Sequence, residues 1–226
     1  MKMKADWRRS IPHRMLVASA MLMLASPVFA APYTLKLTSV GDGANNGSVY
    51  YSPYVGTVSQ GGKQIYSGYL VCDDFNTHTN VGQSWGATET NAGALNGTEK
   101  FAGETYMVGA QTYTTQQMYD AAGWLVNQLL PGNATNQPVQ ANISFAIWDI
   151  FDGTQAGGAV ETDIVDAFNE VTTDHYVASN IEVFTPVPSS ASQEFLIPVS
   201  VPEPAALVLF AVGLAGIGFR LRSRHT

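Results

Sequence analysis

The chain has 226 residues and a formal net charge of −7. All six arginines lie in the two end segments, so between Ala31 and Pro204 three lysines stand against seventeen of the eighteen acids. This body carries a charge of about −14, which repels phosphate backbones and excludes a nucleic-acid partner. Its length of about 170 residues is enough for one domain with a hydrophobic core.

The first thirty residues have the pattern of a secretory signal peptide. A basic stretch precedes the apolar residues 15–26, and Pro27-Val-Phe-Ala30 ends the run. This order predicts a signal peptide over residues 1–30 with cleavage between Ala30 and Ala31. We therefore expect the Sec translocon and signal peptidase as partners. The alternative is an uncleaved anchor helix, for which the apolar run is short.

Strands are predicted at both ends of the body. Five segments show alternation or are rich in tyrosine and β-branched residues: 33–40, 48–55, 64–72, 181–184 and 195–201. The polar, glycine-containing residues 77–98 predict a long loop.

The middle of the body is predicted to be helical. Residues 114–130 begin with a threonine cap at Thr114, and 139–151 carry an apolar stripe that ends before Gly153. Residues 161–171 predict a third, shorter helix. Strands, a helical block and strands again favour an α+β domain over residues 31–200. We expect a β-sandwich or barrel with an insertion of two to three helices.

The C-terminal segment, residues 201–226, combines three parts in a fixed order. Val201-Pro202-Glu203-Pro204 comes first, the uncharged residues 205–219 follow, and the tail then carries three arginines, Arg220, Arg222 and Arg224. Fifteen helical residues cover about 22 Å, less than the roughly 30 Å of a hydrocarbon core, so we expect a marginal transmembrane helix. The positive-inside rule places the arginines in the cytoplasm and the body outside.

This ordered set resembles the PEP-CTERM sorting signal of Gram-negative bacteria. The resemblance implies recognition by an exosortase, transient anchoring in the inner membrane, cleavage near the motif, and release or attachment at the outer surface. It also implies an association with exopolysaccharide and biofilm production. The alternative is an ordinary single-pass tail anchor.

Cys72 is the one cysteine of the chain. Exported proteins normally pair their cysteines, and Cys72 has no partner for an internal disulfide. Three interpretations remain: a small buried apolar residue, an intermolecular link, or a chemically special residue.

Residues 69–75, 121–130 and 145–151 together resemble the thioester domains of bacterial surface adhesins. In that family a strand cysteine is bonded to a helix glutamine, and the strained acyl group captures a nucleophile. The family's glutamine lies four residues before the helix tryptophan, where this chain has Ser144. Gln140, one turn earlier, is the candidate partner of Cys72. The resemblance is also compatible with a thioester-like fold that lacks the bond.

Other reactive patterns are sparse. Asp73 and Asp74 are expected to raise the pKa of the Cys72 thiol rather than lower it. The paired acids Asp73/Asp74 and Asp149/Asp152 suit a glycosidase or a calcium site, although their place at a helix end before Gly153 favours a capping or surface role for Asp149 and Asp152. HExxH, CxxC, P-loop and GxSxG patterns are missing from the sequence. We therefore assign no catalytic residue, metal or cofactor.

The sequence thus predicts a structural or binding protein of the extracellular matrix rather than an enzyme. A covalent adhesin that uses Cys72 and a carbohydrate-active enzyme are the alternatives.

Overall fold

The computed structural model describes residues 33–41, 45, 49–130, 132–154 and 157–199. The predicted signal peptide (1–30), the sorting segment (201–226) and its apolar helix (205–219) lie outside these residues. Within the described part of the chain, no helix has both the length and the apolar character needed to cross a bilayer.

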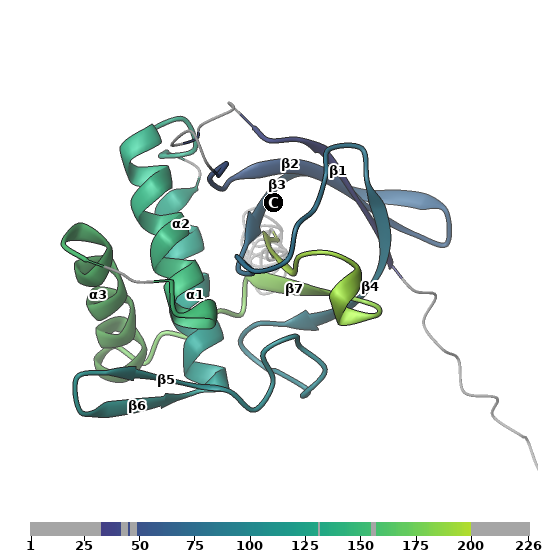
Figure 1. The fold of residues 1–226 in the computed structure, drawn as a ribbon. Helices are drawn as coiled ribbons and strands as arrows, with labels where there is room; N and C mark the ends of the chain where they lie inside the picture. Colours follow the sequence, from purple (N-terminus) through teal and green to yellow (C-terminus); the bar gives the residue numbers. More distant parts are fainter. Residues whose placement is uncertain (1–32, 42–44, 46–48, 131, 155–156, 200–226) are drawn as a thin grey trace, which may run out of the picture. The chain divides into compact units, whose positions relative to one another are not determined.

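Six antiparallel strands close into a barrel with the order β1-β2-β3-β8-β7-β4 (Figure 1). Their bounds are β1 Tyr33–Ser39, β2 Tyr54–Gln60, β3 Lys63–Cys72, β4 Ser84–Asn91, β7 Ile181–Pro186 and β8 Phe195–Pro198. A short 3₁₀ helix, η1, covers Ser189–Ala191 just before β8. The barrel therefore combines strands from both ends of the body, as the α+β prediction requires.

Three helices and a hairpin form the insertion between β4 and β7. The helices α1 (Thr115–Leu129), α2 (Gln137–Asp152) and α3 (Ala159–Thr173) pack against one another, and α2 also contacts β3 (Figure 1). The strands β5 (Thr105–Val108) and β6 (Gln111–Thr114) pair as a separate two-stranded sheet. An α+β fold with a barrel and three helices confirms the predicted fold class.

The end of β3, from Leu70 to Cys72, and the strands β7 and β8 are buried on both faces. Leu70 and Phe195 belong to the core inside the barrel, whereas their neighbours Val71 and Leu196 belong to the core shared with the helices. Alternate side chains along one strand therefore fill two different cores. This arrangement fixes the position of the helices against the barrel at the end of β3, where Cys72 lies.

Local signals set the ends of the helices. The Thr114 hydroxyl accepts from the backbone N–H of Gln117, whose side chain returns a bond to the backbone of Thr114, so α1 begins with a complete capping box. Gly153 ends α2 in the left-handed conformation, with φ of 64°, which glycine adopts without steric cost. The three predicted helices are confirmed within a few residues at each end.

Two strand assignments from the sequence are wrong. The predicted strand 48–55 is replaced by β2, which begins only at Tyr54, because Pro53 offers no N–H and the N–H of Ser52 donates to Ser144 on α2. The predicted loop 77–98 contains β4, whose Trp85 and Ala87 point into the barrel. Only Gly86 lies between these two, and the polar residues on either side of them conceal the alternation. The β5–β6 hairpin was also not predicted.

Gly123 allows α1 to lie close to the segment before β7, since a Cβ atom there would overlap the Cβ atom of Ala178. We expect Gly123→Val to lower the free energy of unfolding by about 2 kcal/mol, because the added methyl groups must displace buried neighbours. Chemical denaturation measures the change. Gln128→Val, at an exposed position of the same helix, is the matched control and should cost less than about 1 kcal/mol. Equal losses in both variants would contradict the close approach.

Candidate functional site

Cys72 is held where the barrel meets the helices. Its backbone N–H donates to the Ser52 hydroxyl at 3.0 Å, and its carbonyl accepts from the indole Nε1 of Trp148 at 3.0 Å. Ser52 in turn donates its own N–H to the hydroxyl of Ser144 at 3.0 Å. Two side chains of α2, one turn apart, thus bind the end of β3 and the segment that precedes β2.

The Cys72 thiol is fully buried and hydrogen-bonded. Its Sγ donates to the carbonyl of Asp74 at 3.1 Å and accepts from the backbone N–H of Asp74 at 3.4 Å. Burial raises the pKa of the thiol well above its ordinary value, and the neighbouring carboxyl groups of Asp73 and Asp74 raise it further. The protonated thiol is a poor nucleophile at neutral pH, as the sequence predicted from the two acids that follow Cys72.

Gln140, the predicted partner of Cys72, points elsewhere. Its side-chain amide donates to the carbonyl of Ala134. Along α2 it lies eight residues, or about 12 Å, before Trp148, whose indole reaches Cys72. The structure therefore brings Ser144 and Trp148 to this site, and not Gln140.

A different glutamine reaches the site. The Nε2 of Gln193 donates at 2.8 Å to the carbonyl of Asp74, which also accepts from Sγ of Cys72. Gln193 lies just before β8, more than one hundred residues along the chain from Cys72. Sequence reasoning missed it because no local pattern marks a side chain that arrives through barrel closure.

Two buried carboxyl groups, Asp73 and Glu194, lie against each other beneath Cys72. Glu194 accepts from the Tyr119 hydroxyl at 2.5 Å, from the Lys100 backbone N–H at 2.9 Å, and from the Thr185 hydroxyl. No described N–H or hydroxyl donates to the carboxyl oxygens of Asp73. Its partner is the Glu194 carboxyl, a contact that becomes a hydrogen bond when Asp73 carries a proton.

Burial and the neighbouring charge set the protonation of this pair. Burial, followed by the charge of Glu194, raises the pKa of Asp73 well above its ordinary value. Burial also raises the pKa of Glu194, while the hydroxyls of Thr185 and Tyr119 oppose that rise. Asp73 is therefore the protonated member and Glu194 the charged one. This buried, internally satisfied pair is a structural element that joins β3 to β8.

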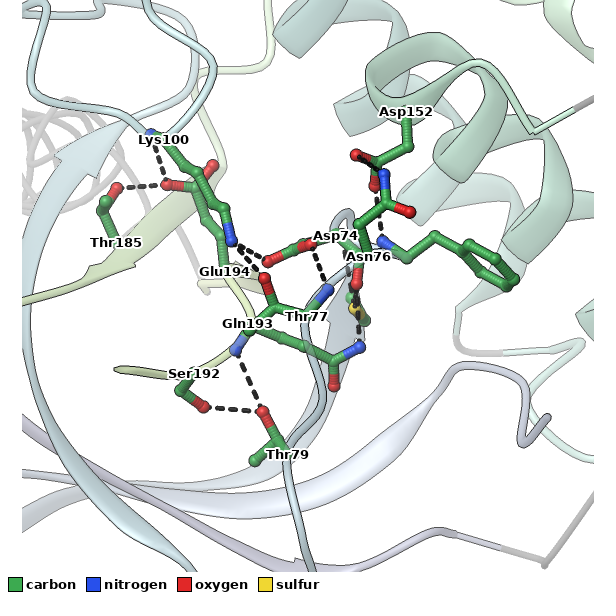
Figure 2. A network of polar contacts seen from close by, with 12 residues as sticks. Asp74, Asn76, Thr77, Thr79, Lys100, Asp152, Thr185, Ser192, Gln193 and Glu194 are labelled. Carbon is green, nitrogen blue, oxygen red and sulfur yellow. Dashed lines mark hydrogen bonds and ion pairs between the residues drawn. The ribbon is translucent and has the colours of Figure 1, made fainter. Parts of the chain in front are cut away.

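Asp74 organises the segment that follows β3. One carboxyl oxygen forms an ion pair with Lys100, and the other accepts from the Thr77 N–H at 3.0 Å. Figure 2 shows Lys100, Thr77 and Gln193 converging on Asp74. Farther along, the Thr79 hydroxyl accepts from the backbone N–H of Gln193 at 3.0 Å. Residues 73–79 are thus fixed to the segment before β8.

Asp152, at the end of α2, fixes the same segment from the other side. Its carboxylate accepts from the Phe75 N–H at 2.6 Å and from the Asn76 side chain at 2.8 Å (Figure 2). Asp149 instead accepts from the Tyr106 hydroxyl at 2.5 Å. The two acids therefore serve separate contacts, and the described residues contain no cluster of three or more ligands suited to a metal ion.

A cavity of about 190 Å³ adjoins the site on the far side of Trp148. Phe75 packs against the Trp148 ring with centroids 5.2 Å apart, and Tyr54, His78 and Gln193 also line the space. The contacts that hold residues 73–79 therefore also shape one wall of this cavity.

The tail carries a recognisable sorting motif. Residues 200–223 match the PEP-CTERM protein-sorting motif. The predicted PEP-CTERM resemblance is thus confirmed, and the chain is an exported surface protein that an exosortase processes. The sequence has no match among curated proteins.

The body is similar to solved domains of bacterial surface proteins. One is the N-terminal thioester domain of a surface protein from Clostridium perfringens, with 13% identity, a TM-score of 0.43, and coverage of 74% of this chain and 97% of that one. Another is the N-terminal domain of the pilus tip adhesin Cpa of Streptococcus pyogenes, with 14% identity, a TM-score of 0.44, and coverage of 78% and 97%. A third is the N-terminal thioester domain of the fibronectin-binding protein SfbI from Streptococcus pyogenes. It has 11% identity, a TM-score of 0.43, and coverage of 78% of this chain and 97% of that one. Surface thioester domains are the class that residues 69–151 resemble.

The state of Cys72 has a direct chemical signature. We expect the native thiol to react with an alkylating reagent at least about a hundredfold more slowly than in denaturant, because it is buried and protonated. The intact mass should equal the sequence mass after processing. A deficit of about 17 Da, the ammonia lost when a thiol displaces an amide, would contradict this expectation and reveal a thioester. Cys72→Ala is the control for both measurements.

The carboxyl pair gives the protein a characteristic pH dependence. Unfolded Asp73 loses its proton near pH 3.9, whereas folded Asp73 keeps it to a much higher pH. The folded state then binds more protons than the unfolded one, so the free energy of unfolding falls as pH rises above about 4. One such proton gives a slope of up to about 1.4 kcal/mol per pH unit.

Asp73→Asn should remove this dependence, since an amide can donate to Glu194 without titrating. Denaturation at several pH values should show a shallower decline in the variant. Asp174→Asn, which removes an exposed acid, serves as the control. An unchanged slope in Asp73→Asn would contradict the shared proton.

Proposed function

We propose that this chain is a non-catalytic binding or structural protein of the extracellular matrix, associated with the exopolysaccharide of its own cell. The observation that carries the proposal is the sorting motif at residues 200–223. It supports delivery of the acidic body to the cell exterior, where polysaccharide is the surrounding material.

The proposed route begins with the signal peptide, which the Sec translocon and signal peptidase remove at Ala30–Ala31. The apolar residues 205–219 then hold the chain in the inner membrane, with Arg220 to Thr226 in the cytoplasm. Cleavage by an exosortase near Pro202-Glu203-Pro204 releases the body to the outer surface.

The arrangement of acids and thiol supports a role without catalysis. General acid–base catalysis requires a carboxyl group that reaches the substrate. Asp73 and Glu194 are both fully buried, and both carboxylate oxygens of Asp152 accept hydrogen bonds from the segment after β3. Burial also suppresses the nucleophilicity of Cys72.

One contact favours a second candidate function, a covalent adhesin. Cys72 and the amide of Gln193 bind the same carbonyl, that of Asp74, so the two groups needed for a thioester are neighbours. In this alternative Gln193 takes the role that the sequence assigned to Gln140. The intact-mass measurement on the exported protein separates the two functions.

The sorting step can be tested in the cell. Deleting the exosortase gene should leave the chain in the membrane fraction with its tail attached. The mass of this form should exceed that of the processed protein by more than about 2 kDa, because about twenty residues remain attached. The double variant Pro202→Ala/Pro204→Ala should reproduce this effect in wild-type cells. Fractionation and intact mass measure both.

Thr226→Ala, which lies beyond the matched motif, is the matched control and should be processed normally. Normal release from cells without an exosortase would contradict the proposed route.

A further inference from the structure

The cavity beside Trp148 lies at one end of the barrel. Its walls come from the end of β1, the residues just before β2, the segment after β3, and α2. Trp148 and Tyr54 are buried, whereas Tyr50 and His78 are exposed. The cavity therefore has an aromatic floor and a mouth that faces the solvent.

The aromatic side chains of the floor are held in place before any ligand arrives. The Trp148 indole donates to the Cys72 carbonyl, and the Tyr54 hydroxyl donates to the Tyr50 carbonyl at 2.7 Å. Phe75 packs on Trp148, and its own backbone N–H is bound by Asp152. Rings that are fixed in this way lose little entropy when a ligand binds, which favours affinity.

Uncharged polar groups surround the mouth. Gln193 uses its backbone N–H and its amide nitrogen within the protein, and no described residue donates to its side-chain oxygen. The Tyr50 hydroxyl and the His78 ring likewise have no hydrogen-bond partner among the described residues. The mouth thus offers both donors and acceptors for hydroxyl groups.

Among the described residues that line this cavity, none carries a carboxylate, ammonium or guanidinium group. Two other hollows, of about 250 and 490 Å³ on the helical side, each include at least one acid. A charged ligand would lose its hydration without gaining a counter-ion, and the acidic body would repel an anion besides. The cavity therefore selects an uncharged ligand.

The volume limits the size of that ligand. Pockets that enclose drug-sized molecules measure roughly 300–1,000 Å³, so about 190 Å³ accommodates a single ring. Aromatic faces attract the C–H faces of a saturated ring, and the polar rim can bind its hydroxyl groups.

We propose that this cavity binds one neutral sugar residue of a polysaccharide, stacked on the Phe75 ring that Trp148 supports and hydrogen-bonded at the Tyr50, His78 and Gln193 rim. The inference rests on the proposed matrix function and names its ligand class. An uncharged hexose fits, whereas a uronic acid does not.

Binding can be measured with the exported protein purified from its own cells. Calorimetry or ligand-observed NMR should show binding of a neutral disaccharide among cellobiose, maltose and lactose, and at least about tenfold weaker binding of digalacturonate. Tyr50→Ala should weaken binding of the neutral sugar about fivefold to tenfold, the value of one hydrogen bond at the rim. Tyr69→Ala, an exposed tyrosine outside the cavity, should leave binding within about twofold.

Gln193→Ala provides a second variant, and thermal melting checks that each variant folds. Unchanged sugar binding in both Tyr50→Ala and Gln193→Ala would overturn the site, as would tighter binding of digalacturonate than of every neutral disaccharide. Sedimentation with the cell's own exopolysaccharide separates the two levels of the proposal. Wild-type levels of binding in the cavity variants would overturn the assignment of the sugar site to the cavity but not the matrix function. Absence of binding by the wild-type protein would overturn the matrix function as well.

Discussion

The hydrogen bond from the Trp148 indole to the Cys72 carbonyl joins the two halves of the body. It connects α2 to the last residue of β3, where the strand leaves the barrel. Burying an indole N–H is costly unless it finds an acceptor, and the end of a strand supplies a carbonyl that the barrel no longer uses. The turn that follows, the carboxyl pair beneath it and the aromatic cavity beside it all take their positions from this junction.

The same junction explains how an acidic protein keeps several acids inside. Each of the three buried carboxyl groups at this junction is stabilised in a different way. Glu194 is surrounded by hydrogen-bond donors, Asp73 holds a proton, and Asp74 faces Lys100. Lys100 is one of only three cations in the body, and it is placed where two strands and a turn meet. The residues after β3 are thereby immobilised by side chains rather than by a sheet, which suits a surface that has to be shaped before it meets a ligand.

Local patterns in the sequence predict much of this fold. The three helices follow from their apolar stripes and from the Thr114 cap and Gly153 stop, because these signals act over a few residues. Strand β4 escaped prediction because Trp85 and Ala87, with only Gly86 between them, stand among polar residues, and only barrel closure buries them. Contacts such as Asp73 with Glu194, or Gln193 with Asp74, join residues more than one hundred positions apart, and no periodicity encodes them. Ser144 is noted in the sequence only because it stands where the thioester family has its glutamine, and its hydrogen bond to Ser52 depends on where the chain before β2 passes.

The place of β8 in the chain determines where a force applied through the tail would act first. This strand ends at Pro198, two positions before the sorting motif begins, so any anchor attached there pulls on β8 first. β8 has only four residues and pairs with β3 at just two of them. All four also pair with β7, so extraction must first break that pairing. Behind it stands the Glu194 side chain, which Tyr119, Thr185 and Lys100 hold in the interior. A pulling force on the tail would therefore load the β7–β8 pairing first and the buried, charge-assisted contacts of Glu194 after it.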